Sequence, residues 1–274
     1  MKTITSMTVL LVFLSAIAPA YGNLLVTPKR IVFDQRERTQ QVILVNSTTD
    51  TRSYRLEWVE QRQVSGGSYQ VLKTEEAEGR KKASDLMRFS PRQVTLGPGE
   101  RQVVKIVARR SANMEPGEYR SHLLFSALPP AIEESDEEVD GISMKLNVLV
   151  SYSIPVLLNV GYQSPQVSVS NVKVQERPDQ DNKFADILVA LDKRGEYSTY
   201  GTIKAFYRSS DSESFEQVGL LNGVSIFGEA DSYNAMLSWM GLPESRKGEL
   251  KIRYEGAAEF NGKTFTEELF PLDL

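Results

Sequence analysis

The sequence predicts an all-β protein, and three observations support this fold class. Short apolar stretches with an alternating pattern recur roughly every eight to twelve residues, and turn signals rich in glycine and proline separate them. No long stretch has the apolar period of a helix. This spacing is typical of immunoglobulin-like β-sandwiches, and 274 residues are enough for one or two domains.

The longest strand signal covers residues 142–158, with the sequence ISMKLNVLVSYSIPVLL. From Ile142 to Ile154 every second residue is apolar, and the residues between are polar apart from Leu149. This is the period-two pattern of a strand with one apolar face. Because Pro155 cannot donate a hydrogen bond to a neighbouring strand, we expect the strand to end or bend there. The apolar row consists of Ile142, Met144, Leu146, Val148, Val150, Tyr152 and Ile154.

This apolar row is longer than one small sandwich needs. From Ile142 to Ile154 an extended strand would reach about 40 Å, about twice the length of a common strand. Two interpretations stay open on the pattern alone. The stretch is either a long core strand shared by two sheets, or part of its apolar row is meant for another protein.

The first 22 residues differ from the rest of the chain. Lys2 gives a positive start, residues 9–17 are apolar, and Ala18, Ala20 and Gly22 are small. This pattern predicts a secretory signal peptide that is cleaved after Gly22 or after Ala20. The apolar run is too short to span a bilayer, and no later stretch approaches about twenty apolar residues. We therefore expect the mature protein to be exported and soluble, without a membrane span.

Composition argues against several functional classes. Loss of Lys2 with the signal peptide moves the net charge from −4 to −5, whereas a nucleic-acid binder would show a basic excess. Cysteine is absent, so no disulfide, thiol nucleophile or cysteine-ligated metal site can form. His122 is the only histidine, and the chain has no nucleophile elbow, phosphate-binding glycine loop or calcium loop. We expect no catalytic residue, no metal site and no cofactor, with His122 as a surface or packing residue.

The order of the strand signals divides the chain into a signal peptide (1–22), a first domain (23–158) and a second domain (159–274). We expect strand 119–128 to form a hairpin with 142–158 across an acidic loop, and residues 159–165 to be the linker. The strands expected in the second domain are 167–174, 185–191, 201–207, 224–228, 249–254 and 264–270.

Several motifs carry a family resemblance by their order and spacing. They are TPKRIVFD (27–34), FSPRQV (89–94), LGPGERQVV (96–104), GEYRSHLLF (117–125) and SIPV (153–156). Together they resemble the PapD-like periplasmic chaperones of the chaperone–usher pathway, over residues 24 to about 158. The second domain is similar to the family more loosely, through 194–201 and the region of Trp239.

The resemblance implies two immunoglobulin-like domains in a boomerang arrangement. It also implies a periplasmic protein that binds fimbrial or pilus subunits and delivers them to an outer-membrane usher. Chaperones of this family lend an edge strand to subunits that lack their last strand, which is β-augmentation by donor-strand complementation. By this resemblance the donor-strand residues are Ile142, Met144, Leu146, Val148 and Val150.

The resemblance also implies a cationic anchor for the terminal carboxylate of the subunit. Arg30 matches the family's arginine on the first strand. The family's donor-strand lysine has no counterpart, because its place falls at Val150 or Ser151. Arg120, on the neighbouring strand, is the candidate replacement for this second cation.

A second class of function stays open beside the chaperone. An exported structural or adhesive accessory component of a surface appendage would have the same export signal and the same β-sandwiches. An enzyme is less favoured, because His122 alone has an ordinary pKa suited to acid–base chemistry near neutral pH.

Overall fold

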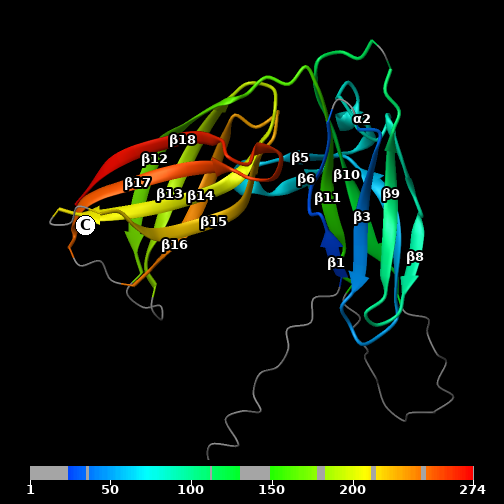
Figure 1. The fold of residues 1–274 in the computed structure, drawn as a ribbon, viewed down its shortest axis with the longest axis horizontal. Helices are drawn as coiled ribbons and strands as arrows, with labels where there is room; N and C mark the ends of the chain where they lie inside the picture. Colours follow the sequence, from blue (N-terminus) through cyan, green and yellow to red (C-terminus); the bar gives the residue numbers. More distant parts are fainter. Residues whose placement is uncertain are drawn as a thin grey trace, which may run out of the picture.

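The computed structural model describes residues 24–34, 37–111, 113–129, 149–177, 183–210, 214–241 and 245–273. The regular secondary structure of these residues is almost entirely β-strand, so the all-β prediction is confirmed. Figure 1 shows two sandwiches whose strands run at a wide angle to each other, as expected for the boomerang arrangement. In the described ranges no helix is long and apolar enough to cross a membrane.

The first sandwich is built from two sheets that share the beginning of the chain. Residues 24–27 form β1 (Leu24–Thr27), which pairs antiparallel with β3 (Thr39–Asn46) in one sheet. Residues 31–33 form β2 (Ile31–Phe33), which pairs parallel with β11 (Tyr152–Val160) in the other sheet. One sheet has the order β1 (Leu24–Thr27), β3 (Thr39–Asn46), β9 (Arg101–Ala108) and β7 (Met87–Ser90). The other has the order β2 (Ile31–Phe33), β11 (Tyr152–Val160), β10 (Gly117–Ala127), β4 (Arg52–Val59) and β8 (Gln93–Leu96).

The core of the first sandwich follows from the period-two pattern of its strands. Alternate residues of each strand point inward, so apolar side chains from the two sheets meet between them. Fully burying one such side chain contributes about 1.5–3 kcal/mol. The fully buried members include Phe33, Val42, Leu44, Val104, Ile106, Leu123, Phe125, Val156 and Leu158.

Strand β11 contains the second part of the stretch 142–158, from Tyr152 onward. The predicted hairpin with β10 is confirmed, with His122 opposite Pro155 and Phe125 opposite Tyr152. The strand does not end at Pro155, the first of the two outcomes predicted there, because β11 continues to Val160. Strand β2 pairs with β11 only from Val156 onward, so among the described residues Pro155 lies where β11 has one neighbour. A proline is tolerated at such an edge.

The beginning of the predicted donor strand lies outside the described residues. This concerns Ile142, Met144, Leu146 and Val148. Val150 is described, lies outside any strand and has 36% of its surface exposed. The described strand therefore begins at Tyr152.

A small hairpin, which the sequence did not predict, extends from the first sandwich toward the second (Figure 1). It consists of β5 (Gln61–Gln63) and β6 (Tyr69–Val71), followed by the short helix α2 (Thr74–Ala77). Its tip contains Gly67, with a φ of 79°. A Cβ at Gly67 would lie 2.6 Å from the ring of Tyr233 in the second sandwich, so the close approach requires glycine.

The second sandwich consists of two sheets in which all strand pairs are antiparallel. Strand β16 (Ser232–Met240) was not predicted. Strand β15 (Glu216–Ile226) begins eight residues before the predicted strand 224–228. Asn159 and Val160 complete β11, which shortens the expected linker to 161–165. The three-stranded sheet is β12 (Gln166–Glu176), β13 (Lys183–Arg194) and β16 (Ser232–Met240). The four-stranded sheet is β15 (Glu216–Ile226), β14 (Thr199–Ser209), β17 (Lys247–Gly256) and β18 (Thr264–Asp273).

Trp239 is the largest buried side chain of the second core. Its ring packs edge-on against Phe184 at 5.2 Å and is tilted against Tyr207 at 5.0 Å between ring centroids. Trp239 comes from the unpredicted β16, whose inward row also includes Ala235 and Leu237. The second sandwich thus has a core of its own, separate from that of the first.

Candidate functional site

The two arginines that the sequence singled out meet at one aromatic ring between the sandwiches. Arg30 lies just before β2, Arg120 lies on β10, and Phe227 follows β15. The guanidinium carbon of Arg120 is 3.8 Å from the ring centroid of Phe227, and that of Arg30 is 5.5 Å away. A cation over an aromatic face is attracted by the ring quadrupole. The fold therefore gathers two positive charges at the junction of the domains.

Each arginine is paired with a carboxylate of the second sandwich. Arg30 Nε donates to Glu259 Oε1 at 2.8 Å. Arg120 Nη2 donates to Glu229 Oε1 at 2.5 Å and to the Gln61 carbonyl at 3.0 Å. The arginine side chains are only 5% and 6% exposed, whereas each glutamate side chain is 23% exposed. Each carboxylate is therefore more accessible to solvent than the guanidinium group that it pairs with.

Both arginines retain a donor without a partner. Nη1 of Arg30 and Nη1 of Arg120 are buried and make no hydrogen bond within the described part of the chain. A buried charged donor without an acceptor costs free energy. This makes the junction a place where a further acceptor, such as a carboxylate oxygen, would be stabilised.

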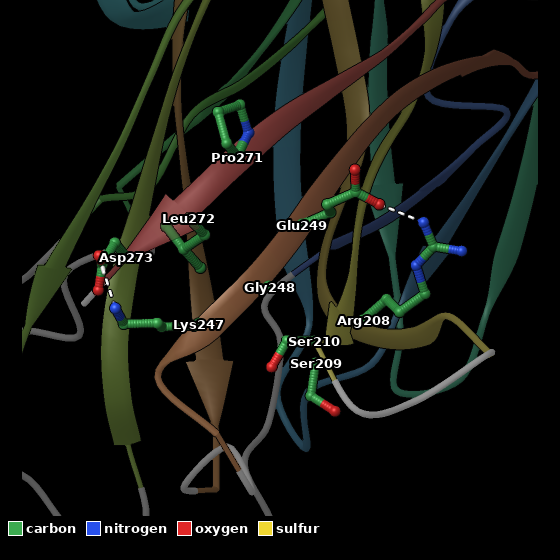
Figure 2. A pocket seen from close by; sticks show the side chains of 9 residues that line it. All are labelled: Arg208, Ser209, Ser210, Lys247, Gly248, Glu249, Pro271, Leu272 and Asp273. Carbon is green, nitrogen blue, oxygen red and sulfur yellow. Dashed lines mark hydrogen bonds and ion pairs between the residues drawn. The ribbon is translucent and has the colours of Figure 1, made fainter.

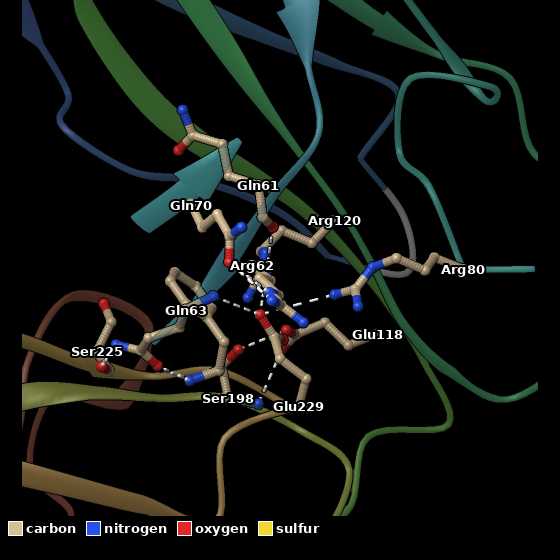
Figure 3. Close-up of polar contacts among 11 residues, drawn as sticks. Gln61, Arg62, Gln63, Gln70, Arg80, Glu118, Arg120, Ser198, Ser225 and Glu229 are labelled. Carbon is tan, nitrogen blue, oxygen red and sulfur yellow. Dashed lines mark hydrogen bonds and ion pairs between the residues drawn. The ribbon is translucent and has the colours of Figure 1, made fainter. Parts of the chain in front are cut away.

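Glu229 is held by several donors from the first sandwich (Figure 3). Besides Arg120, the amide of Gln63 donates to Glu229 Oε1 at 2.9 Å, and Arg80 lies 3.6 Å from the same oxygen. Burial alone would raise the pKa of Glu229. The charge and hydrogen bond of Arg120, together with backbone hydrogen bonds, outweigh burial and hold that pKa below its usual value. Glu229 is thus ionised and fixed at neutral pH.

Gln63 joins the hairpin to the second sandwich through its side chain. Its Nε2 donates to the Ser225 carbonyl at 2.7 Å, and its Oε1 accepts from the Phe227 amide at 2.9 Å. Figure 3 shows the first of these contacts beside the Glu229 group. The side-chain amide thereby satisfies a backbone donor and acceptor at the end of β15, as a neighbouring strand would.

A second group of polar contacts lies near the linker. Glu118 accepts from the Ser198 amide at 2.8 Å and from its hydroxyl at 2.5 Å. The hydroxyl of Tyr197 donates to the carbonyls of Val160 and Gly161 at 2.5 and 2.7 Å. These bonds join the end of β11 and the start of β10 to the second sandwich.

His122 is a packing residue at the same junction. It is 1% exposed and lies with its ring centroid 5.3 Å from that of Tyr69 and 6.2 Å from that of Phe227. Burial, and then the positive charge of Arg120, lower its pKa to about 3. His122 is therefore neutral at neutral pH and is poorly placed for acid–base chemistry in solution.

An open depression of the second sandwich lies away from this junction. It has a volume of about 690 Å³ and is formed by the ends of β14, β17 and β18 (Figure 2). Its charges neutralise each other, since Arg208 pairs with Glu249 and Lys247 lies 3.5 Å from Asp273. None of the predicted site residues lines this depression. Over the described residues, no group of three or more histidine, cysteine, aspartate or glutamate side chains is placed to hold a metal ion.

Sequence reasoning missed the partners that the second sandwich contributes. Phe227, Glu229 and Glu259 lie about two hundred or about one hundred residues along the chain from the arginines that they contact. No local pattern marks an isolated acidic residue as a buried ion-pair partner. Only the close packing of the two sandwiches brings these groups together.

Comparisons with known proteins give structural matches only. No protein-family model matches the chain, and no curated protein matches its sequence. The chain is similar to a structure of the SafA pilin with the SafB chaperone of Salmonella enterica, at 11% identity and a TM-score of 0.45, covering 93% of this chain and 99% of that one. It is similar to the E. coli chaperone DraB, at 11% identity and a TM-score of 0.44, covering 92% and 96%.

A third similar structure is the CsuC–CsuE complex of chaperone and tip adhesion subunit from Acinetobacter baumannii. Its identity is 12% and its TM-score 0.42, and the match covers 92% of this chain and 99% of that one. The structures that this chain resembles are thus those of pilus chaperones, alone or with a subunit. At these identities the function has to be argued from the chain's own residues.

Proposed function

We propose that this chain is a periplasmic chaperone that binds fimbrial or pilus subunits by lending them an edge strand and then delivers them to an outer-membrane usher. The observation that carries the proposal is the open edge of β11. Within the described residues, Tyr152–Pro155 pair with β10 on one side and with no strand on the other. Such an edge offers backbone donors and acceptors to an incoming strand.

The register of β2 indicates where the end of an added strand would lie relative to Arg30 and Arg120. Strand β2 runs parallel to β11 and pairs Ile31 with Val156, so Arg30 is level with Pro155. A subunit strand that is parallel to β11 and fills the open edge would end where β2 begins. Its terminal carboxylate would then lie near Arg30, and Arg120 would add positive charge from the neighbouring strand.

The apolar row upstream of β11 supplies the side chains for this exchange. In the proposal, Ile142, Met144, Leu146, Val148 and Val150 fill pockets of the subunit that its missing strand leaves open. Leu149 and Val150, the described end of this stretch, are 42% and 36% exposed, so this end is free to take part in an interface. The signal peptide predicted for residues 1–22 supports a periplasmic location for this activity.

The test is recovery of subunits from cells that also express the neighbouring subunit genes. A tagged chain should be found in periplasmic extract in a complex with subunits and should be absent from purified surface fibres. Incorporation of the chain into the fibres would instead show that it is a structural or adhesive component of the appendage. A soluble chain that carries no subunit would also contradict the proposal.

A further inference from the structure

We infer that Glu259 occupies the carboxylate site of Arg30 in the free protein and has to leave that site when a subunit binds. The inference rests on the proposed function, because it takes Arg30 as the group that receives the terminal carboxylate of the subunit. Glu259 would then lower the affinity of the site, and only a ligand that brings its own strand and carboxylate would displace it.

The geometry of Arg30 supports this role. Its side chain is 5% exposed, and Glu259, whose side chain is 23% exposed, accepts from its Nε at 2.8 Å. The Nη1 group of Arg30 is buried and has no acceptor among the described residues. A ligand carboxylate that takes the place of Glu259 at Nε would therefore also find a donor, Nη1, that Glu259 does not use.

The two glutamates of the junction are held to different degrees. Glu229 has Arg120, the Gln63 amide and Arg80 around one carboxylate oxygen. The carboxylate of Glu259 has its contact with Arg30 and no second hydrogen bond or ion pair in the described ranges. Glu229 is thus the fixed contact between the sandwiches, and Glu259 is the displaceable one.

The backbone that carries Glu259 is a single short turn. The turn Ala258–Phe260 contains the only described non-glycine residue with positive φ, Ala258 at 52°. Such a conformation is unfavourable for a residue with a Cβ and is retained only when its surroundings enforce it. Phe260, at the end of the turn, packs against Tyr162 of the linker with ring centroids 5.8 Å apart. A local change of this turn would withdraw Glu259 and leave β17 and β18 paired.

Competition between two carboxylates predicts the direction of the effect. A ligand carboxylate and Glu259 cannot both be placed at Arg30 without like-charge repulsion, which is costly in a partly desolvated site. Replacing Glu259 by glutamine removes the charge and keeps the shape of the side chain. We expect the affinity of the site for a carboxylate to rise about ten-fold, which corresponds to the removal of about 1.4 kcal/mol of like-charge repulsion in a partly desolvated site.

The experiment is a titration of the full mature chain with acetate at constant ionic strength, followed by the NMR signal of the Arg30 Nε–H group. That signal is identified by its absence in the Arg30→Ala protein. In Glu259→Gln the signal should reach its limiting shift at about ten-fold less acetate than in the parent. The matched control is Glu267→Gln, which removes a glutamate of the same sandwich that pairs with Arg253 on the exposed face. It should titrate like the parent.

Equal titration of the parent and Glu259→Gln, including no response in either, would overturn the inference. Weaker acetate binding in Glu259→Gln would also overturn it, because Glu259 would then position Arg30 and not compete for it. Subunit recovery is read separately in the same proteins. If the parent recovers no subunit, the proposed function is wrong. The ratio of the acetate concentrations that saturate the parent and Glu259→Gln still tests whether Glu259 competes for Arg30.

Discussion

The buried His122 should make the stability of this protein depend on pH in a window where no other side chain normally titrates. His122 is the only histidine of the chain, is 1% exposed and has no hydrogen-bond partner for either ring nitrogen in the described part of the chain. Burial is the main cause of its lowered pKa of about 3, and Arg120 and Arg30 lower the pKa further, while Glu229 opposes them.

The size of the effect follows from the two pKa values. In the unfolded chain His122 binds a proton with a pKa near 6.5, whereas in the folded protein it does so only near 3. The unfolded state therefore binds more protons between these values, so stability is complete above pH 6.5 and falls as the pH decreases toward 3. Each pH unit costs about 1.4 kcal/mol, which gives about 2 kcal/mol at pH 5. This figure requires only that the folded pKa lies well below 5.

Urea unfolding at pH 7.5 and pH 5 measures this difference. The parent should lose about 2 kcal/mol of unfolding free energy between the two conditions. His122→Leu should lose almost none, because leucine does not titrate, and at pH 7.5 it should stay within about 1 kcal/mol of the parent, because no hydrogen bond is removed. The lowered pKa of Glu229 places its titration below 4.5, outside this window. Equal stability of the parent at both pH values, or the same loss in His122→Leu, would refute the reasoning.

Two further predictions concern the anchor and the second sandwich. Arg30→Ala should weaken subunit binding by about 2–5 kcal/mol, because the subunit carboxylate would lose its partner in a partly desolvated site. Co-purification should fail for this variant and persist for Lys29→Ala, an exposed neighbour; unchanged recovery with Arg30→Ala would place the anchor elsewhere. Gly201→Ala should lower the melting temperature strongly, since a Cβ there would overlap the Glu255 carbonyl across β14 and β17. Gly97→Ala meets only ordinary contacts and should melt near the parent, whereas similar melting of both variants would contradict this account.

The sequence predicts those features of the fold that depend on interactions between neighbouring residues. Alternation and turn signals depend on neighbouring residues, so the two sandwiches and the pairing of β10 with β11 were predictable. A strand end at Pro155 was a wrong prediction, because a proline ends a strand only where it would have to donate to a second neighbouring strand, and the neighbours are a property of the sheet. Strand β16 was missed because Met236 and Met240 place apolar residues on its exposed face as well and obscure the alternation.

The candidate site was predictable only on the side of the first sandwich. Arg30 could be found because it lies in a motif of the family that the sequence resembles. Arg120 could be found because it lies on the strand next to the predicted donor strand. Gln63, by contrast, lies in a short hairpin without an apolar row, and its role depends on contacts with Ser225 and Phe227 across the junction. Contacts between distant segments have no local sequence pattern, so the acidic partners of the arginines became visible only in the folded structure.

The most direct test of the chaperone proposal compares the free protein and its subunit complex for Leu146→Ala and Leu146→Glu. A donor side chain fills a pocket of the subunit, so Leu146→Ala should cost about 2–4 kcal/mol of complex stability and little in the free protein. Leu146→Glu should remain folded and soluble, with the melting temperature of the parent, and should recover no subunit. If Leu146 lay in the protein's own core instead, Leu146→Ala would lower the free energy of unfolding of the free protein by about 2–5 kcal/mol. If melting collapses while the remaining folded protein still recovers subunits, Leu146 does not belong to a donor strand.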